Sequence, residues 1–189
     1  RVIKPSASSD SIWVGSFSGM NLLKKTGFEV FMADNHNSFG SIVAFSEIPG
    51  IGYAVGTYRN GIYIFQYSVE SAVPRNIALL LPNYRENVDP VMALSGSINS
   101  LWIGHRNSGL EKISFIQDRS ESISTDYFSS AESQSISDIL QLGEGEMLVG
   151  TYGRGLHFFK DGKLNRSFIV DEKNESGLLD NRIIFLFKD

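Results

Sequence analysis

The sequence contains no cysteine, which excludes a disulfide-stabilised scaffold and a cysteine-ligated zinc site. Its three histidines, His36, His105 and His157, do not have the spacing of a metal-binding motif. No apolar run approaches the roughly 20 residues that a membrane-spanning helix needs. The formal net charge of −4 argues against nucleic-acid binding, because phosphate recognition needs a basic face. We therefore expect a protein domain without a metal or another cofactor.

The composition is that of a globular domain. Hydrophobic residues make up 42% and charged residues 20% of the 189 positions, which is enough apolar material to build a core. The chain opens on Arg1 and carries no signal peptide, so we expect it to be part of a longer protein. No segment shows the apolar spacing of an amphipathic helix, and helix content should be close to nil.

An internal repeat organises the whole chain. Glycines at positions 15, 56, 104 and 150 recur at intervals of 41, 48 and 46 residues. Each ends a short apolar stretch: Ile12-Trp13-Val14-Gly15, Tyr53-Ala54-Val55-Gly56, Leu101-Trp102-Ile103-Gly104 and Met147-Leu148-Val149-Gly150. A second glycine and another apolar stretch follow each one, at Gly19, Gly61, Gly109 and Gly155. This pattern predicts a tight hairpin between two buried strands.

Further candidate strands flank each hairpin. Apolar stretches precede it at 42–45, 91–94 and 136–142, and outer strands are predicted at 28–32, 77–81, 125–128 and 168–170. Four short strands in each unit of about 45 residues are typical of a β-propeller blade. A β-sandwich also has short strands, but it has no reason to repeat Trp-Ile-Gly at a fixed interval. We predict an all-β propeller with repeats at 1–33, 40–82, 90–129 and 135–171, and the first strand of a fifth at 181–189.

The ends of the chain bear on how the propeller closes. Residues 1–7 already supply a first strand for the first blade, so a terminal strand at 183–187 has no vacancy to fill in that blade. We therefore expect an open part of a larger, seven-bladed propeller, with a closed four-bladed ring as the alternative. Within the blades, Trp13 and Trp102 should be buried in equivalent positions, with Ala54 and Leu148 in the matching places.

The turns between the second and third strands of each unit carry the candidate ligand-binding residues. These are Tyr58, Arg59 and Asn60, then His105, Arg106 and Asn107, then Tyr152 and Arg154. In a propeller such turns share one face with the connections between blades. Arginine makes bidentate bonds to carboxylate or sulfate, and aromatic rings stack on sugars. An acidic oligosaccharide is therefore a candidate ligand, although solvated turns whose arginines pair with neighbouring aspartates would have the same composition.

Signals for catalysis are nearly absent. The glycine-rich stretch at 150–155 lies in a repeated turn and lacks the lysine and helix of a phosphate-binding loop. A glycosidase needs two carboxylates at a defined separation, and the acidic candidates Asp10, Asp89, Asp138 and Asp180 fall near predicted loops, where aspartate is common. We predict no catalytic residues in this chain.

The repeats resemble two-component regulator propeller repeats. The resemblance lies in Leu101-Trp102-Ile103-Gly104 with Gly109-Leu110, in Leu148-Val149-Gly150-Thr151 with Gly155-Leu156, and in the segment 177–183. Such repeats build the periplasmic sensor region of hybrid two-component histidine kinases of Bacteroidetes, where they help to detect glycan fragments. The resemblance implies a periplasmic part of a dimeric inner-membrane receptor, whose membrane span, kinase and DNA-binding parts lie outside this chain. A polysaccharide-degrading propeller enzyme and a protein-interaction scaffold are the alternatives.

Overall fold

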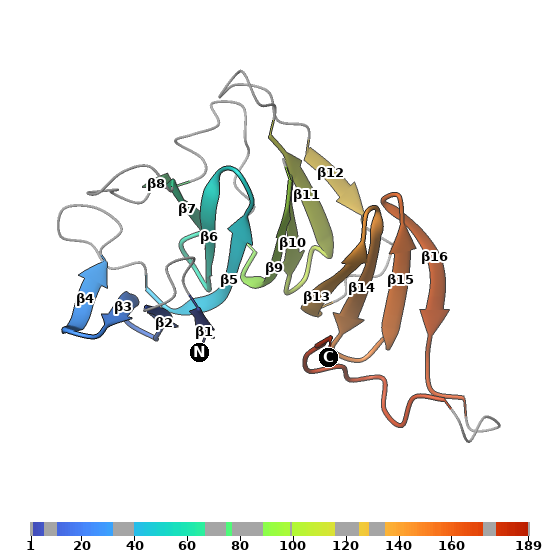
Figure 1. Cartoon of the computed structure of the whole chain (residues 1–189). Helices are drawn as coiled ribbons and strands as arrows, with labels where there is room; N and C mark the ends of the chain where they lie inside the picture. The colour runs from blue at the N-terminus through green and yellow to red at the C-terminus, as the bar shows by residue number, and fades with distance from the viewer. Residues whose placement is uncertain are drawn as a thin grey trace.

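The computed structural model describes residues 2–5, 11–31, 40–66, 75–76, 89–98, 100–115, 125–128, 135–171 and 177–188. These residues form four antiparallel sheets of four strands each, drawn in Figure 1. Blade 1 contains β1 (Val2–Pro5), β2 (Ile12–Gly15), β3 (Met20–Lys24) and β4 (Gly27–Phe31). Blade 2 contains β5 (Ile42–Ile48), β6 (Gly52–Thr57), β7 (Ile62–Gln66) and β8 (Arg75–Asn76). Blade 3 contains β9 (Val91–Ser97), β10 (Ser100–His105), β11 (Leu110–Ser114) and β12 (Thr125–Phe128). Blade 4 contains β13 (Ile136–Gly143), β14 (Glu146–Thr151), β15 (Leu156–Lys160) and β16 (Lys163–Phe168).

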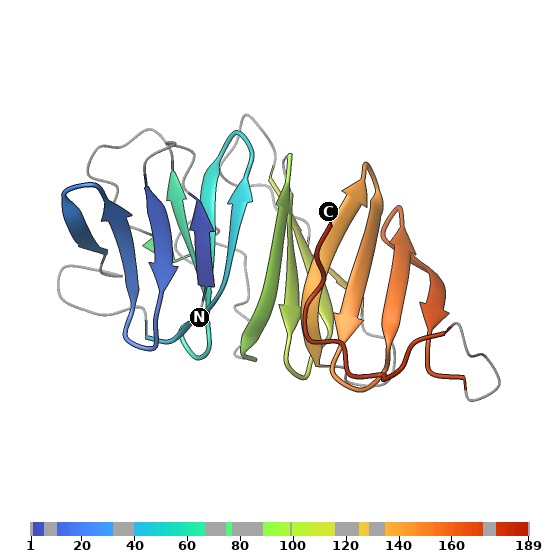
Figure 2. The same cartoon turned by 60° about the horizontal axis from the view of Figure 1, so that its bottom comes forward.

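The sheets follow one another in chain order as blade-like units (Figures 1 and 2). Within each sheet the strands are paired in the order of the sequence. The first strands of neighbouring sheets lie against each other, β5 against β9 and β9 against β13. This confirms the predicted all-β class and the four-stranded repeat unit. In the described part of the chain no helix is present that could cross a membrane.

Two predicted outer strands differ from those observed. The last strand of blade 4 is Lys163–Phe168 and not 168–170, because a two-residue turn reverses the chain directly after β15. Asp161 and Gly162 form this turn with φ angles of 50° and 73°, the left-handed conformation that tight hairpins need. In blade 1 the outer strand is Gly27–Phe31, one residue earlier than predicted. The predicted strand 77–81 lies outside the described residues.

In blades 2, 3 and 4 the first glycine of the repeat allows the segment that follows the blade to approach closely. A Cβ atom on Gly56 would lie 2.5 Å from Val91, one on Gly104 2.4 Å from Ile136, and one on Gly150 2.7 Å from Ile183. Contacts this short cannot be accommodated without moving the neighbouring blade. The first glycine of the repeat in blades 2, 3 and 4 therefore serves the packing between blades, whereas the second glycine, such as Gly61 with φ 70°, serves the turn.

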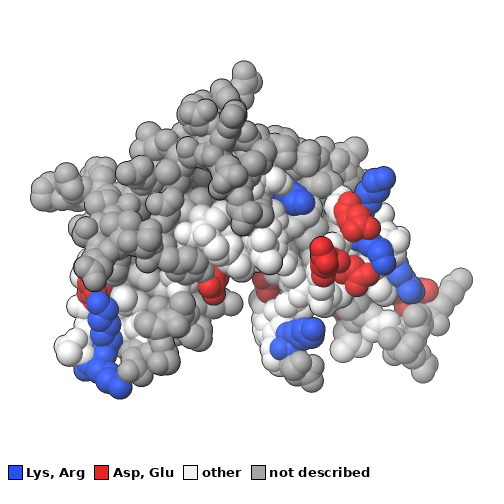
Figure 3. Space-filling model, turned by 45° about the horizontal axis from the view of Figure 1, so that its top comes forward, with Lys and Arg blue, Asp and Glu red and all other residues white. Residues whose placement is uncertain are grey.

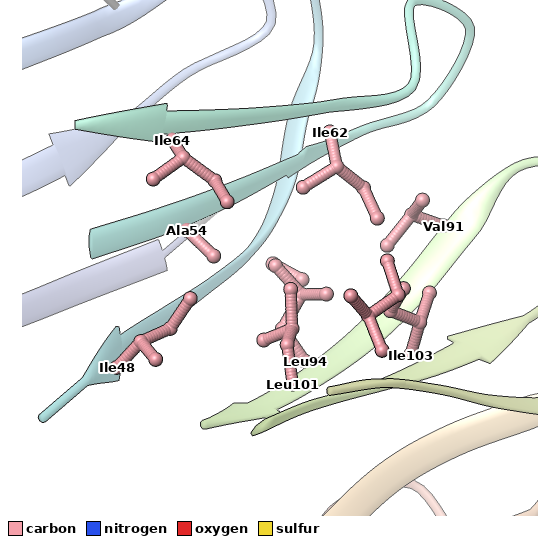
Figure 4. Packing of buried hydrophobic residues seen from close by; sticks show 10 residues of the cluster. Ile48, Ala54, Ile62, Ile64, Val91, Leu94, Leu101 and Ile103 are labelled. Carbon is pink, nitrogen blue, oxygen red and sulfur yellow. The ribbon is translucent and has the colours of Figure 1, made fainter. Parts of the chain in front are cut away.

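Apolar clusters fill the spaces between the blades. Figure 4 shows the cluster between blades 2 and 3, in which Leu101 and Ile103 of β10 face Ile48 and Ala54 of blade 2. A second cluster lies between blades 1 and 2 around Trp13, and a third between blades 3 and 4 around Trp102. Both tryptophans are 7% exposed and pair in register with equivalent strands. Their predicted burial is confirmed, with Ala54 buried and Leu148 half-buried in the matching positions.

The segment 183–187 was predicted to be the first strand of a fifth unit. Its backbone starts as expected, because Ile183 N donates to Thr151 O at 2.9 Å. The first strand of blade 2 starts in the same way, since Ile42 N donates to Ser16 O, the equivalent position of blade 1, at 2.9 Å. Leu186 N then donates to the Asp138 carboxylate at 2.7 Å. The segment lies against blade 4 but belongs to none of the four described sheets. Its side chains Phe185 and Phe187 are more than 70% exposed.

Candidate functional site

The candidate face is formed by the four turns that join the second and third strands of each blade. In three of the turns a hydroxyl group closes the loop. Ser16, Thr57 and Thr151 each donate a side-chain hydrogen bond to the second glycine's carbonyl, at 3.0, 2.9 and 2.8 Å. Each also accepts a bond from a backbone amide inside the turn, at 3.3, 2.8 and 3.0 Å. The hydroxyl holds the turn in one conformation and so positions the residue that follows it.

The third turn is built differently, because His105 stands where the other blades have serine or threonine. Its Nε2 atom lies 2.7 Å from Glu111 Oε2, and the two side chains are 1% and 0% exposed. The imidazole therefore points into the blade and does not reach the surface. Because it is buried, His105 does not belong to the ligand-contacting set that the sequence predicts. The sequence alone could not distinguish a buried turn residue from an exposed one.

Asp89 replaces the missing hydroxyl in the third turn. Its carboxylate accepts hydrogen bonds from the backbone amides of Asn107 and Ser108, both at 2.6 Å. It also accepts bonds from their side chains, at 2.6 and 2.7 Å. Burial acts to raise the pKa of Asp89, but these hydrogen bonds outweigh it and hold the pKa below the ordinary value of 3.8. Asn107 thus anchors the turn through its side chain.

Replacing Asp89 with alanine should lower the free energy of unfolding at neutral pH by about 1–2 kcal/mol, because four donors lose their acceptor. Since the folded-state pKa is depressed, the stabilisation by Asp89 is present at neutral pH and disappears as the pH falls below about 4. Urea titrations at pH 7 and pH 3 will measure this, and the difference between the wild type and the variant should be smaller at pH 3 than at pH 7. Equal destabilisation at both pH values would contradict the role of the ionised carboxylate.

The residue after each closing position projects from the face. These equivalent residues are Phe17, Tyr58, Arg106 and Tyr152. Phe17 is 70% and Tyr152 59% exposed. The Arg106 guanidinium donates a hydrogen bond to the Tyr58 hydroxyl and lies 5.9 Å from the centre of its ring. Blades 2 and 3 therefore present one joined aromatic and cationic unit.

A second such unit lies at the fourth blade. Arg182 forms a backbone bridge with Tyr152 and pairs with Asp180 at 2.6 Å. Hydrogen bonds from Arg182 lower the pKa of Asp180 to about 2, so the pair is fully ionised at neutral pH. The same pairing, followed by a smaller contribution from Tyr152, raises the pKa of Arg182.

The structure brings some of the predicted site residues together and separates others. Tyr58 and Arg106 are in contact, whereas Tyr152 contacts Arg182, which was not among the predicted residues. Arg59, Asn60 and Arg154 are exposed on the same turns. No group of three or more potential metal ligands occurs among the residues with described positions.

Phe17 and Arg182 were not predicted from the sequence. Phe17 lies in a turn one residue shorter than the others, which hid its equivalence to Tyr58 and Tyr152. An alignment on the Gly-Ser or Gly-Thr pair that ends the apolar stretch would have shown this equivalence, because Phe17, Tyr58 and Tyr152 each follow such a pair directly. Arg182 lies in the lead-in to the next unit, and only the close approach of that segment to blade 4 brings it to Tyr152.

The structure is similar to crystal structures of a bacterial extracellular domain. It matches the extracellular domain of BT4673 of B. thetaiotaomicron, described as a hybrid two-component system, with a TM-score of 0.76 and 21% identity. A second structure of that domain, described as belonging to a one-component system, matches with a TM-score of 0.73 and 21% identity. In both cases the match covers 100% of this chain and 24% of the other, so the chain spans about a quarter of their length.

A designed protein also has a similar fold. The computationally designed Ika8 protein matches with a TM-score of 0.59 and 11% identity, over 93% of this chain and 49% of that protein. No protein-family model and no curated protein matches the sequence. The shared fold agrees with the resemblance of the repeats to two-component sensor propellers, and the chain has the fold found in the extracellular domain of such a system.

Proposed function

We propose that this chain is a ligand-binding part of the extracytoplasmic sensor region of a two-component receptor. The observation that carries the proposal is the row of equivalent turn residues on one face, with exposed rings at Phe17 and Tyr152 and the contact of Arg106 with Tyr58. The similarity in fold to the extracellular domain of BT4673 supports the sensor assignment. We infer no catalytic role for this segment; a kinase would lie elsewhere in the parent protein.

The proposed ligand is an acidic oligosaccharide. Exposed aromatic rings offer flat apolar surfaces to sugar rings, and Arg106 and Arg182 offer planar donors to carboxylate or sulfate groups. The closed turns hold the aromatic rings and Arg106 in place before the ligand arrives, which reduces the conformational entropy lost on binding. Nucleic acid is a poorer candidate: on the face that Figure 3 shows, described basic and acidic side chains lie interspersed, without a broad basic patch.

We further propose that the chain is an open part of a larger propeller, with repeats at 1–33, 40–82, 90–129, 135–171 and a fifth beginning at 181–189. The placement of Ile183 against Gly150 supports this, because Val91 and Ile136 occupy the same position against Gly56 and Gly104. The remaining blades of a seven-bladed ring would cover the exposed Phe185 and Phe187. The parent would be a homodimer that is attached to the inner membrane by a separate span, with this region in the periplasm.

Replacing Arg106 with alanine should weaken the binding of a sulfated or uronic-acid oligosaccharide about tenfold, because a charge-assisted bidentate contact is lost. Isothermal titration calorimetry against such oligosaccharides will measure this. Arg166 is the matched control: it also lies close to an aromatic ring, 4.7 Å from that of Phe168, but it belongs to the outer strand β16. Arg166→Ala should bind as the wild type does, and equal affinities for all three proteins would refute the proposed site.

A further inference from the structure

A groove of about 760 Å³ opens between blades 3 and 4. Blade 3 lines it with the β9–β10 turn, Trp102 and Lys112, and blade 4 lines it with residues 141–147 and 161–162. Because consecutive turns of an antiparallel sheet lie at alternate ends, these turns are at the opposite end of the blades from the candidate face. The groove is thus separate from the site proposed above, and its volume is within the range of small-molecule sites.

The packing between blades 1 and 2 shows what normally fills this space. Trp13 there is surrounded by three aromatic rings of blade 2. Their centroids lie 5.9, 5.8 and 6.0 Å from that of the indole, for Phe45, Tyr53 and Phe65 respectively. Phe45, Tyr53 and Phe65 come from the first, second and third strands of blade 2, so three strands pack rings against one side of the tryptophan.

At the junction of blades 3 and 4 two of these rings are missing. The strand registers place Trp102 in the position of Trp13, Ile139 in that of Phe45 and Met147 in that of Tyr53. Aliphatic side chains are shorter than the aromatic ones that they replace. The groove borders Trp102 and Met147, the positions at which the junction of blades 1 and 2 has Trp13 and the Tyr53 ring.

Charged residues line the groove. Lys112 stands where the other three blades have Leu22, Ile64 and Phe158. Its ammonium lies 5.2 Å from the centre of the Trp102 ring, so the indole already binds one cation. Three carboxylates line the groove as well, from Glu144, Glu146 and Asp161. Glu146 also pairs at 2.9 Å with Lys160, which does not line the groove.

We propose that this groove binds a small organic cation with an apolar body, such as an aromatic ammonium compound. The apolar body lies against Trp102 and Met147, where blades 1 and 2 bring the Tyr53 ring against Trp13. The positive nitrogen replaces Lys112 on the indole and is attracted by the excess of carboxylates over ammonium groups. Exposed Ile98 and Leu142 at the edge of the groove add apolar contact for the ligand.

Calorimetric titration of the wild-type protein with benzyltrimethylammonium tests the proposal, with 3-phenylpropionate as an anion of similar shape. We expect saturable one-to-one binding of the cation and none of the anion. Absence of saturable cation binding, or equal binding of both probes, would overturn the proposal. Either result leaves the oligosaccharide site untouched, because that site is at the other end of the blades.

Three variants locate the binding. Lys112→Leu introduces the residue that blade 1 has and should tighten cation binding at least about threefold, since it removes a competing charge. Glu144→Gln, an exposed change, should weaken it by a similar factor. Met147→Tyr introduces the tyrosine that blade 2 has at the equivalent position, Tyr53, and should abolish cation binding because the ring fills the groove. Thermal melting verifies that this variant folds. Binding that is indifferent to all three changes would place the cation elsewhere and refute the site.

Discussion

Replacing Gly96 with alanine should lower the free energy of unfolding by about 3 kcal/mol, the upper part of the range for overpacked sites. Gly96 is in β9, where the first strand of blade 3 crosses that of blade 2. A Cβ atom there would lie 2.0 Å from Glu47 O and 2.8 Å from its carbonyl carbon. Both are backbone atoms, so no side-chain rotation can relieve the clash. The two blades would have to separate, which would also break the bond from Gly96 N to Ser46 Oγ, 2.7 Å long.

Gly143→Ala is the matched control for this substitution. Gly143 also lies in a first strand, β13, but no atom comes within 4 Å of its added Cβ. The change should alter stability by less than about 0.5 kcal/mol. Urea denaturation followed by circular dichroism will compare the three proteins. If Gly96→Ala and Gly143→Ala have the same midpoint, the close approach of blades 2 and 3 is not a determinant of stability.

Truncating Trp13 to alanine should cost about 3–5 kcal/mol, the range for removing a large buried aromatic side chain. The indole contacts rings of blade 2 and is 7% exposed, so its removal leaves a cavity between two blades. Trp13→Phe should cost much less, because a ring remains to pack against Phe45 and Tyr53. Differential scanning calorimetry and urea titration will measure both changes.

Trp102→Ala provides an internal comparison. Trp102 is equally buried, but one side of its indole already borders the groove between blades 3 and 4. Fewer packing contacts are lost there, and the destabilisation should be smaller than that of Trp13→Ala. A larger loss of stability for Trp102→Ala than for Trp13→Ala would contradict the difference in packing between the two junctions.

Much of the fold could be predicted from the sequence, because local patterns are enough to define a hairpin. The apolar stretch before Gly104, the second glycine and the next apolar stretch predicted β10 and β11 as observed. Outer strands were harder, since they are exposed and lack a periodic apolar signal. Strand β16 was missed because Lys163 to Arg166 is mostly polar, and its pairing depends on the tight turn at Asp161 and Gly162.

The candidate site was predicted less completely than the fold. The turns themselves were identified, and Tyr58 and Arg106 lie on the predicted face in contact with each other. The burial of His105 could not be predicted, because it depends on Glu111 in the paired strand. Likewise, the partner of Asn107 proved to be Asp89 of the same blade, which lies 18 residues away in the sequence.

The sequence by itself determined the repeat and the strand order within a blade, because a hairpin depends on residues near one another along the chain. The close approach at Gly56, Gly104 and Gly150 involves residues more than 30 positions further along the chain and belongs to the tertiary structure. Tertiary structure alone decided which side chains meet between blades. Trp13 and Trp102 have the same local sequence context, yet one is surrounded by rings and the other borders a groove. That difference arises from residues more than 30 positions away, at Tyr53 and Met147, which reach the tryptophans only when successive blades stack.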